Sequence, residues 1–189
     1  MIFKNDELTQ ELERTGALLK GHFLLSSGLH SQRYLQCAKI LQHPEVAGRI
    51  GESLAEMVKD FDIDVVAAPA IGGILVGHET GRAIGVRSVF SERENGKMTF
   101  RRGLEIKKGE RVMVVEDVIT TGGSIKECIA AVKESGGDVV VMGSIIDRSG
   151  GKFDIGIPYK ALLQVDVPAF EQTECPECAN GTDAIKPGS

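Results

Sequence analysis

The chain has 189 residues, of which 42% are hydrophobic and 26% are charged, and its 27 acidic and 22 basic side chains give a net charge of -5. This composition is typical of one soluble globular domain, which at this length buries roughly 70% of the surface of the unfolded chain, so its core needs neither disulfides nor a structural metal. A disordered chain is excluded, and the acidic balance does not favour non-specific binding to nucleic acid, which requires many basic side chains to neutralise phosphates.

The sequence carries no signal for export or for insertion into a membrane. Its first residues lack the basic and apolar regions of a signal peptide, and no apolar run approaches about 18 residues. Four cysteines are too few for a disulfide scaffold in a chain of this length. We therefore expect a cytoplasmic protein that contacts no membrane and keeps its thiols reduced.

The first predicted elements are two helices and a strand. Residues 6–13 have the pattern of a short helix with Asn5 as its N-cap, and Pro44 suits the first turn of a longer helix. The run 65–68 is apolar, too short for a helix and followed by Pro69, so it predicts a buried strand. The longer helix has an apolar stripe at three- and four-residue spacing, formed by Val46, Ile50, Leu54, Met57, Val58 and Phe61.

Helices and strands alternate along the chain as far as residue 146. The predicted elements are a helix over 73–84, strands over 86–91 and 112–115, a helix over 124–134 and a strand over 139–146. This order predicts an α/β fold with a mostly parallel sheet flanked by helices, in which ligands bind at the carboxyl ends of the strands. Residues 167–189 hold several prolines and few apolar side chains, so we expect an irregular tail and no second domain.

The most informative stretch follows the predicted strand at 112–115. Glu116 and Asp117 lie at the end of this strand, and residues 120–124, Thr-Thr-Gly-Gly-Ser, then turn into a helix. Glycines allow the backbone to approach an anion, the hydroxyls donate hydrogen bonds, and the free N–H groups of a helix N-terminus attract negative charge. Carboxylates accept hydrogen bonds from a sugar diol or hold the water shell of a divalent cation. The stretch therefore predicts a site for a ribose 5-phosphate; the open alternative is that Asp117 or Ser124 only caps the helix.

Residues 114–124 resemble the phosphoribosyl-pyrophosphate signature of the type I phosphoribosyltransferases. Three further segments resemble the orotate phosphoribosyltransferases within that class: residues 21–31 its amino-terminal hood, residues 69–73 its pyrophosphate loop, and residues 145–149 the strand end whose arginine holds orotate. The resemblance implies transfer of a phosphoribosyl group from phosphoribosyl pyrophosphate to orotate in pyrimidine synthesis, with Mg2+ as cofactor. It also implies a single domain with hood elements at about 1–40, a core at about 41–166 and a tail at about 167–189.

The resemblance assigns a role to individual residues. Glu116 and Asp117 would hold the ribose hydroxyls, and magnesium would bind mainly through the substrate, with water-mediated contacts to these two carboxylates. The implied contacts of phosphoribosyl pyrophosphate are Glu116, Asp117, Val118, Ile119, Thr120, Thr121, Gly122, Gly123, Ser124, Ile71, Gly72, Arg93 and Lys97. The implied contacts of orotate are Thr120, Arg148 and Ser26. A guanidinium matches a carboxylate in a bidentate manner, which suits Arg148 to that role; a surface salt bridge is the alternative for this side chain.

The segment 92–103 resembles the mobile catalytic loop of the same family, which in a homodimer reaches the neighbouring active site. Its cations would stabilise charge on the departing pyrophosphate while the loop excludes water. We therefore predict Lys97, Arg93 and Asp117 as catalytic residues. Because neighbouring glutamates offset part of the positive charge, a solvated hairpin is the alternative interpretation of this segment.

Cys175 and Cys178 have the spacing of metal ligands or of a redox pair. A tetrahedral zinc site needs four ligands, and no second Cys-x-x-Cys is present, while the four histidines are scattered and form no ligand pair in the sequence. A shared metal site, a reversible disulfide and ordinary thiols all remain open.

Two other functions compete with transfer to orotate. A type I enzyme that acts on a purine base would not need Arg148 and would favour an aromatic residue in the loop that follows it. A regulator that senses phosphoribosyl pyrophosphate and binds RNA or DNA would need a basic face or an added module, and the acidic chain shows neither.

Overall fold

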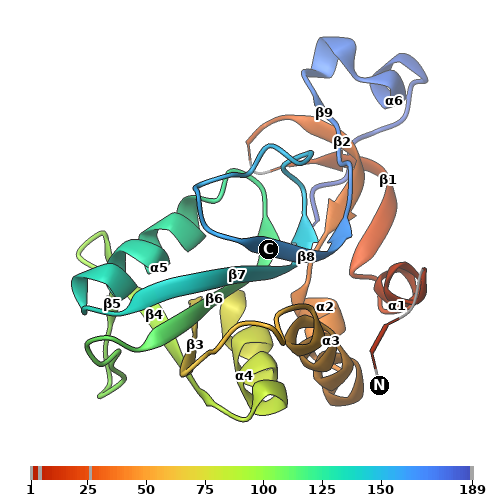
Figure 1. Cartoon of the computed structure of the whole chain (residues 1–189). Coiled ribbons are helices and arrows are strands. Elements are labelled where there is room, and N and C mark those ends of the chain that lie inside the picture. The colour runs from red at the N-terminus through yellow and green to blue at the C-terminus, as the bar shows by residue number, and fades with distance from the viewer. Residues whose placement is uncertain (1, 4–5, 26, 188–189) are drawn as a thin grey trace.

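The computed structural model describes residues 2–3, 6–25 and 27–187, and within them six strands form one sheet in the order β5-β4-β3-β6-β7-β8 (Figure 1). All neighbours in this sheet are parallel except β4 and β5, which form an antiparallel hairpin. The strands are β3 (Val65–Pro69), β4 (Arg87–Glu94), β5 (Lys97–Phe100), β6 (Arg111–Ile119), β7 (Asp138–Asp147) and β8 (Tyr159–Gln164). The predicted mostly parallel sheet is thus confirmed.

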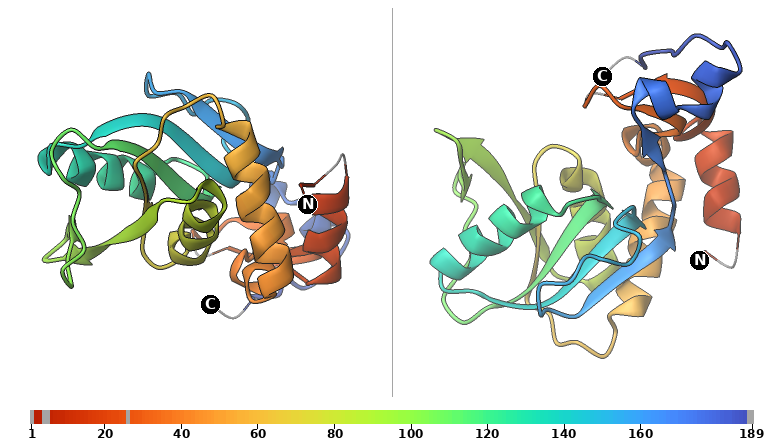
Figure 2. Two further views of the ribbon diagram at one scale, coloured as in Figure 1. Left: turned by 60° about the horizontal axis from the view of Figure 1, so that its bottom comes forward. Right: turned by 90° about the horizontal axis from the view of Figure 1, so that it is seen from above.

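Helices cover both faces of this sheet (Figure 2). Helices α3 (Pro44–Met57) and α4 (Gly73–Ile84) pack on one face, and α5 (Gly123–Glu134) packs on the other. Successive strand residues point to opposite faces, so Val66 of β3 lies in the core under α3 and α4, whereas Val65 lies in the core under α5. Both faces are apolar because both are covered, as expected for a parallel sheet.

The amino-terminal part packs beside α3 and carries a second, small sheet. Helices α1 (Glu7–Arg14) and α2 (Ala38–Leu41) add apolar side chains to the core under α3. Within the described part of the chain the second sheet has the order β1-β2-β9, and we call the hairpin of its first two strands the hood. Its strands are β1 (Leu18–Leu24), β2 (His30–Leu35) and β9 (Ala169–Phe170).

The carboxyl-terminal segment is not the irregular tail expected from the sequence. It contributes β9, a 3-10 turn η1 (Gln172–Glu174) and the short helix α6 (Pro176–Ala179). Its backbone binds the hood, since Leu24 N donates to Ile185 O at 2.9 Å and Ile185 N donates to His22 O at 2.8 Å. These contacts use main-chain groups and need no apolar pattern, which explains why no local pattern predicts them.

Most predicted elements of the core are present, with differences at their ends. The strand predicted at 112–115 continues to Ile119, and β8 was not predicted at all. Met57 was expected on the buried stripe of α3 but is 39% exposed, because α3 ends at this residue. Asn5, the expected N-cap of α1, lies outside the described residues. No helix in the described ranges is long and apolar enough to cross a membrane.

Helices α3 and α4 approach each other at Gly51. A Cβ atom there would lie 2.5 Å from the carbonyl carbon and oxygen of Glu79, which are backbone atoms of α4. We expect Gly51→Ala to lower the free energy of unfolding by about 1–3 kcal/mol, because the helices must move apart to admit the methyl group. Chemical denaturation followed by circular dichroism measures this change.

Gly48, one turn earlier on α3, provides the matched control. A Cβ atom at Gly48 would lie 3.0 Å from Arg82 Nη2, the end of a flexible side chain. Gly48→Ala should therefore leave stability unchanged or raise it by up to about 1 kcal/mol through helix propensity. Equal losses of stability in the two variants would contradict the assigned close packing at Gly51.

Candidate active site

Two carboxylates lie at the carboxyl end of β6, as the sequence predicts. Glu116 is 7% exposed, and Asp117 is partly buried. Both reach the loop after β3: a Cβ atom on Gly72 would lie 2.8 Å from Asp117 Oδ2, and one on Gly73 would lie 3.3 Å from Glu116 Oε1. The predicted pyrophosphate loop and the predicted ribose carboxylates therefore lie in direct contact. Ile71 of the same loop is 86% exposed.

Burial dominates the electrostatics of this pair. The pKa of Glu116 is raised to about 8, first because burial removes water from the carboxylate and then because Asp117 lies beside it. Burial also raises the pKa of Asp117. No cation in the described parts of the chain lowers either pKa. Groups that donate hydrogen bonds to carboxylates, such as a sugar diol, or the water shell of a divalent cation fit this environment.

The loop after β6 leads directly into α5. Gly122 is the residue before the helix, with φ of 74°, and no side chain in the described ranges caps the helix by a hydrogen bond; Asp117 Oδ1 accepts from Val118 N instead. Capping by Asp117 or Ser124, the alternative left open by the sequence, is therefore wrong. The first N–H groups of α5 are available to an anion. A cavity of about 170 Å3 lies in front of them, lined by Glu116 and residues 118–125.

Arg148 follows β7 and borders the same loop. Its backbone N–H donates to Ile119 O at 2.7 Å. Its Nε atom is buried and has no hydrogen-bond partner among the described residues, which does not fit a surface salt bridge. Burial lowers the pKa of the guanidinium. Because a buried guanidinium nitrogen without a hydrogen bond is costly, this side chain favours an anionic ligand.

The buried thiol of Cys37 lies near Glu116, Asp117 and Arg148, and the sequence analysis did not predict this position. Its pKa is raised by burial first, then by the charges of Asp117 and Glu116, whereas Arg148 lowers it. The two carboxylates and the guanidinium therefore act on one thiol and share one neighbourhood. Nothing in the local sequence around Cys37 indicates this, because the contact depends on how α2 packs against the sheet.

The segment predicted as a mobile loop folds as the β4–β5 hairpin. Arg93 pairs with Glu127 at 2.6 Å, and Lys97 pairs with Glu134 at 2.8 Å, and both partners lie on α5. Neither cation lines the cavity of its own chain. The hairpin geometry agrees with the solvated alternative stated above, and the structure does not bring these cations to the two carboxylates. Ser26 lies outside the described residues.

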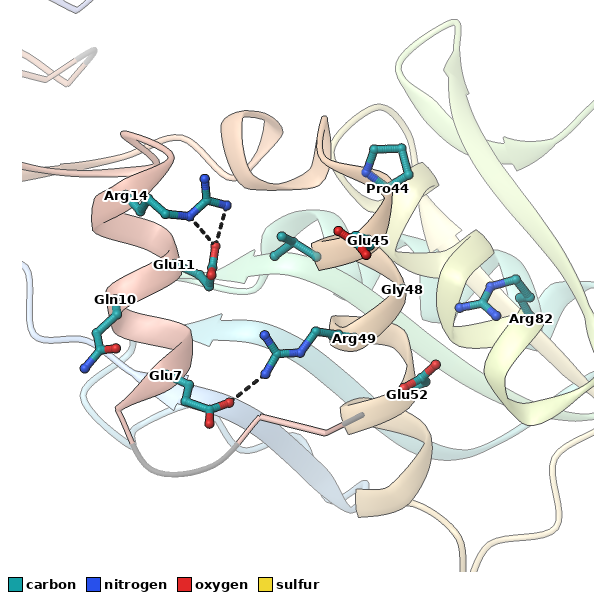
Figure 3. A pocket seen from close by; sticks show the side chains of 11 residues that line it. Glu7, Gln10, Glu11, Arg14, Pro44, Glu45, Gly48, Arg49, Glu52 and Arg82 are labelled. Atoms are coloured by element: carbon teal, nitrogen blue, oxygen red, sulfur yellow. Dashed lines mark hydrogen bonds and ion pairs between the residues drawn. The ribbon is translucent and has the colours of Figure 1, made fainter.

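A larger hollow of about 850 Å3 lies between α1 and α3, away from this site (Figure 3). Its walls carry ion pairs, including Arg49 to Glu7 at 2.6 Å and Arg14 to Glu11 at 2.7 Å. Most of the residues that line it are charged. Ligands of parallel sheets bind at the carboxyl ends of the strands. The smaller cavity lies at this edge of the sheet, so we assign the active site to it rather than to the larger hollow.

Comparison with known proteins agrees with the geometry. Residues 36–177 match the sequence profile of the phosphoribosyl transferase domain. Orotate phosphoribosyltransferase from Thermotoga maritima is 53% identical over 178 residues, which cover 94% of this chain and 95% of that protein. The enzyme of the same name from Caldicellulosiruptor bescii is 53% identical over 184 residues, 97% of each chain. The crystal structure of Mycobacterium tuberculosis orotate phosphoribosyltransferase with inorganic phosphate superposes with a TM-score of 0.70 at 26% identity, covering 84% of this chain and 94% of that one.

The raised pKa of Glu116 makes stability depend on pH. The folded state keeps this proton up to about pH 8, whereas an unfolded glutamic acid loses it near about pH 4.3. Between these values the folded state binds more protons, so the free energy of unfolding falls as the pH rises. Glu116→Gln removes this titration. We expect its melting temperature to exceed that of the wild type by an amount that grows from about pH 4.5 to about pH 8.5, measured by differential scanning fluorimetry.

Glu92 supplies a control of opposite sign. A hydrogen bond from Arg102 lowers the pKa of this exposed carboxyl, so the ionised form stabilises the folded state above the pKa of the unfolded chain. Glu92→Gln should therefore lose stability relative to the wild type as the pH rises toward about pH 5, and the difference should stay constant from there to about pH 8.5. A melting-temperature difference for Glu116→Gln that does not change with pH would contradict the proposed environment of Glu116.

Proposed function

The chain belongs to the phosphoribosyltransferase family, and from this we propose that it transfers the phosphoribosyl group of phosphoribosyl pyrophosphate to orotate in pyrimidine synthesis. The C1–oxygen bond to pyrophosphate breaks, and a bond forms between C1 and N1 of orotate. The observation that carries this proposal is the meeting of three groups at one sheet edge: a buried acidic pair, an uncapped helix N-terminus and an arginine whose Nε has no partner in the described chain.

Each of these groups suits one part of the sugar phosphate. The N–H groups at the start of α5, with the hydroxyls of Thr120, Thr121 and Ser124, bind the 5-phosphate. Glu116 and Asp117 accept hydrogen bonds from the two ribose hydroxyls, and burial makes these bonds strong. The loop at Ile71 and Gly72 binds the pyrophosphate through backbone N–H groups. The ribose is held between these contacts with C1 facing the base.

Arg148 is the group that selects orotate. A guanidinium fork matches the carboxylate of this base, whereas a purine has no such group. An aromatic residue was expected in this loop only for a purine enzyme, and Phe153 does lie there. Its ring, however, packs over Gly122 and contacts Tyr159 edge-on at 5.3 Å between centroids. Phe153 is therefore engaged by the phosphate loop, and Arg148 is the group that we assign to the base.

The chemistry needs charge stabilisation and the exclusion of water. The transition state resembles an oxocarbenium ion, which the carboxylate of Asp117 stabilises. The carboxylates also fit the water shell of Mg2+, since both are buried without a cation in the described chain. Bound with the substrate, magnesium would neutralise the departing pyrophosphate.

We assign Lys97 and Arg93 to the active site of a second subunit. Both lie on an exposed hairpin and form ion pairs with glutamates of α5, and neither lines the cavity of its own chain. In a homodimer the hairpin of one chain would cover the cavity of the other, where its cations stabilise the pyrophosphate. Arg93, Lys97 and Asp117 are then the catalytic groups of one composite site.

A direct assay tests the assignment to orotate. We expect the purified protein with phosphoribosyl pyrophosphate and Mg2+ to consume orotate, followed by its ultraviolet absorbance, and to leave adenine unchanged. Arg148→Gln should raise KM for orotate by about 10- to 100-fold, the loss of a hydrogen bond to a charged group, while KM for phosphoribosyl pyrophosphate stays the same.

Arg148→Lys keeps the charge but loses the fork, and an intermediate KM for orotate is expected from it. Consumption of adenine in place of orotate would overturn the substrate. Equal changes in both KM values for Arg148→Gln would overturn the role of this side chain alone.

Co-expression tests the shared site. Lys97→Ala and Asp117→Asn should each reduce kcat by about 100-fold as homodimers. In a mixed dimer both changes fall in one site and the other site is intact. Random pairing makes about half of the dimers mixed, so roughly a quarter of all sites, and of the wild-type activity, is restored. The measurement is the specific activity of the co-expressed, co-purified protein.

The pair Asp117→Asn and Arg148→Gln is the matched control, assayed at low orotate. We assign both residues to the active site of their own chain, so every mixed site keeps one change and activity should not return. If co-expression of Lys97→Ala with Asp117→Asn does not restore activity, the β4–β5 hairpin does not contribute Lys97 to the active site of the partner subunit.

A further inference from the structure

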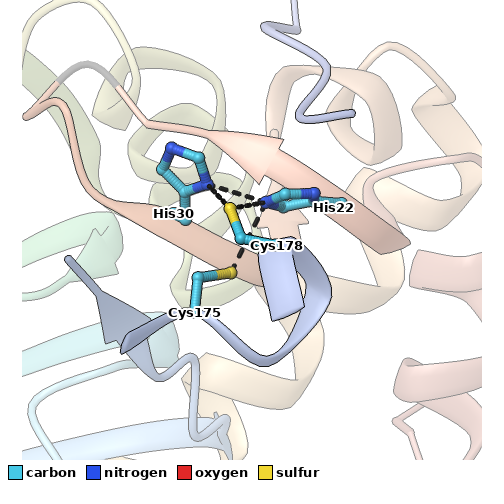
Figure 4. A group of neighbouring side chains, drawn as sticks. All are labelled: His22, His30, Cys175 and Cys178. Atoms are coloured by element: carbon cyan, nitrogen blue, oxygen red, sulfur yellow. Dashed lines mark hydrogen bonds between the residues drawn. The ribbon is translucent and has the colours of Figure 1, made fainter. Parts of the chain in front are cut away.

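Four side chains with metal-binding atoms converge between the hood and the carboxyl-terminal segment (Figure 4). His22 comes from β1, His30 from β2, Cys175 from the residue before α6 and Cys178 from within α6. Their ligand atoms all lie within 4.8 Å of one another. The sequence analysis found no histidine pair to complete the Cys-x-x-Cys, and that expectation is wrong, because the hairpin brings the two histidines to one place.

The spacing of these atoms is close to that of a tetrahedral zinc site. With Zn–S near about 2.3 Å and Zn–N near about 2.0–2.1 Å, sulfur and nitrogen ligands lie about 3.5 Å apart. The structure has Cys175 Sγ 3.4 Å and Cys178 Sγ 3.6 Å from His22 Nε2, and Cys178 Sγ 3.3 Å from His30 Nδ1. The two nitrogens are 2.7 Å apart, so a bound ion needs them to separate slightly.

Hydrogen bonding orients His22 as a ligand. Its Nδ1 atom lies 2.9 Å from the carbonyl oxygen of Thr182, which only accepts hydrogen bonds, so this nitrogen carries the proton. In the neutral ring Nε2 then has a lone pair that faces His30 and the two sulfurs. A backbone carbonyl on the far nitrogen is the usual partner of a metal-bound histidine.

Burial of the cluster also favours a metal. His22, His30 and Cys175 are 6%, 7% and 2% exposed, and Cys178 is half-buried. The surrounding structure has little apolar core of its own, since β9 has two residues and α6 has four. Small units of this kind gain stability from a metal that links them.

We propose that His22, His30, Cys175 and Cys178 bind one Zn2+ ion that fastens the carboxyl-terminal segment to the hood. Two thiols and two imidazoles form a donor set typical of structural zinc, and all four positions are filled by protein, as in a non-catalytic site. A disulfide between the cysteines would use both sulfurs and leave the facing nitrogens unexplained. None of the four residues lines the cavity at α5.

Zinc titration of the full-length protein tests the proposal. The protein is stripped with a chelator under reducing conditions, and the binding of Zn2+ is followed by competition with a chromogenic chelator. We expect one ion per chain and an increase in melting temperature on binding. Cys178→Ser should weaken binding by at least about 100-fold, more than the loss of an outer-shell contact, whereas Cys128→Ser, which changes a buried cysteine on α5, should not alter it.

Cobalt provides a measurement that does not depend on a variant folding. Co2+ added to the stripped wild-type protein should give the thiolate charge-transfer and tetrahedral ligand-field bands of an S2N2 site, and Zn2+ should displace it. Absence of stoichiometric Zn2+ binding, a Co2+ spectrum without thiolate bands, or binding equal in the Cys178→Ser and Cys128→Ser proteins would overturn the proposal. Iron in the protein as isolated, with no uptake of zinc after stripping, would overturn it as well.

Discussion

The site depends on leaving polar and charged groups incompletely paired by the protein at the carboxyl edge of the sheet. Glu116 and Asp117 are buried beside each other with raised pKa values, α5 begins without a side-chain cap, and Arg148 Nε has no partner in the described chain. Each feature costs free energy in the free protein, because buried polar groups are stabilised by hydrogen bonds or counter-charges. A ligand with a phosphate, a diol and a carboxylate supplies a partner for each of these three features. The site therefore binds such a ligand in preference to one that lacks any of these groups.

Glycine positions allow these charges to be placed so close together. At Gly72 a side chain would collide with the carboxylate of Asp117, and at Gly122 one would lie 2.1 Å from the ring of Phe153. Gly122 also has φ of 74°, a conformation that L side chains rarely adopt. Both loops therefore exclude side chains for two reasons at once: they leave room for neighbouring groups, and they expose backbone N–H groups to an anion.

Elements that depend on local signals were predictable, and contacts between distant segments were not. Helix α4 ends at Gly85 with φ of 86°, and β3 is a short buried run, so both follow from the sequence alone. The β4–β5 hairpin also follows from a local signal, because Asn95-Gly96 between two short runs is typical of a hairpin turn, and a hairpin was the alternative interpretation of this segment. The pairing of the tail with the hood involves backbone groups far apart in the chain, which no local pattern encodes.

The cluster of His22, His30, Cys175 and Cys178 shows which contacts could not be predicted from the sequence. In the antiparallel hood Leu24 pairs with His30, and the pairing is irregular between Lys20 and Phe23, where His22 lies. The hairpin brings His22 Nε2 to 2.7 Å from His30 Nδ1, but because the pairing is irregular here, the alternation of strand residues alone does not place His22 on this face. What the sequence does not contain is the approach of Cys175 and Cys178, since the short β9 bridge to Ser31 and the bond from Ile185 to His22 direct the tail across this face. The site at α5 is positioned by a sheet with a large apolar core. The hood has few buried side chains, so packing stabilises it less. An ion bound by four side chains would stabilise the hood and the carboxyl-terminal segment together.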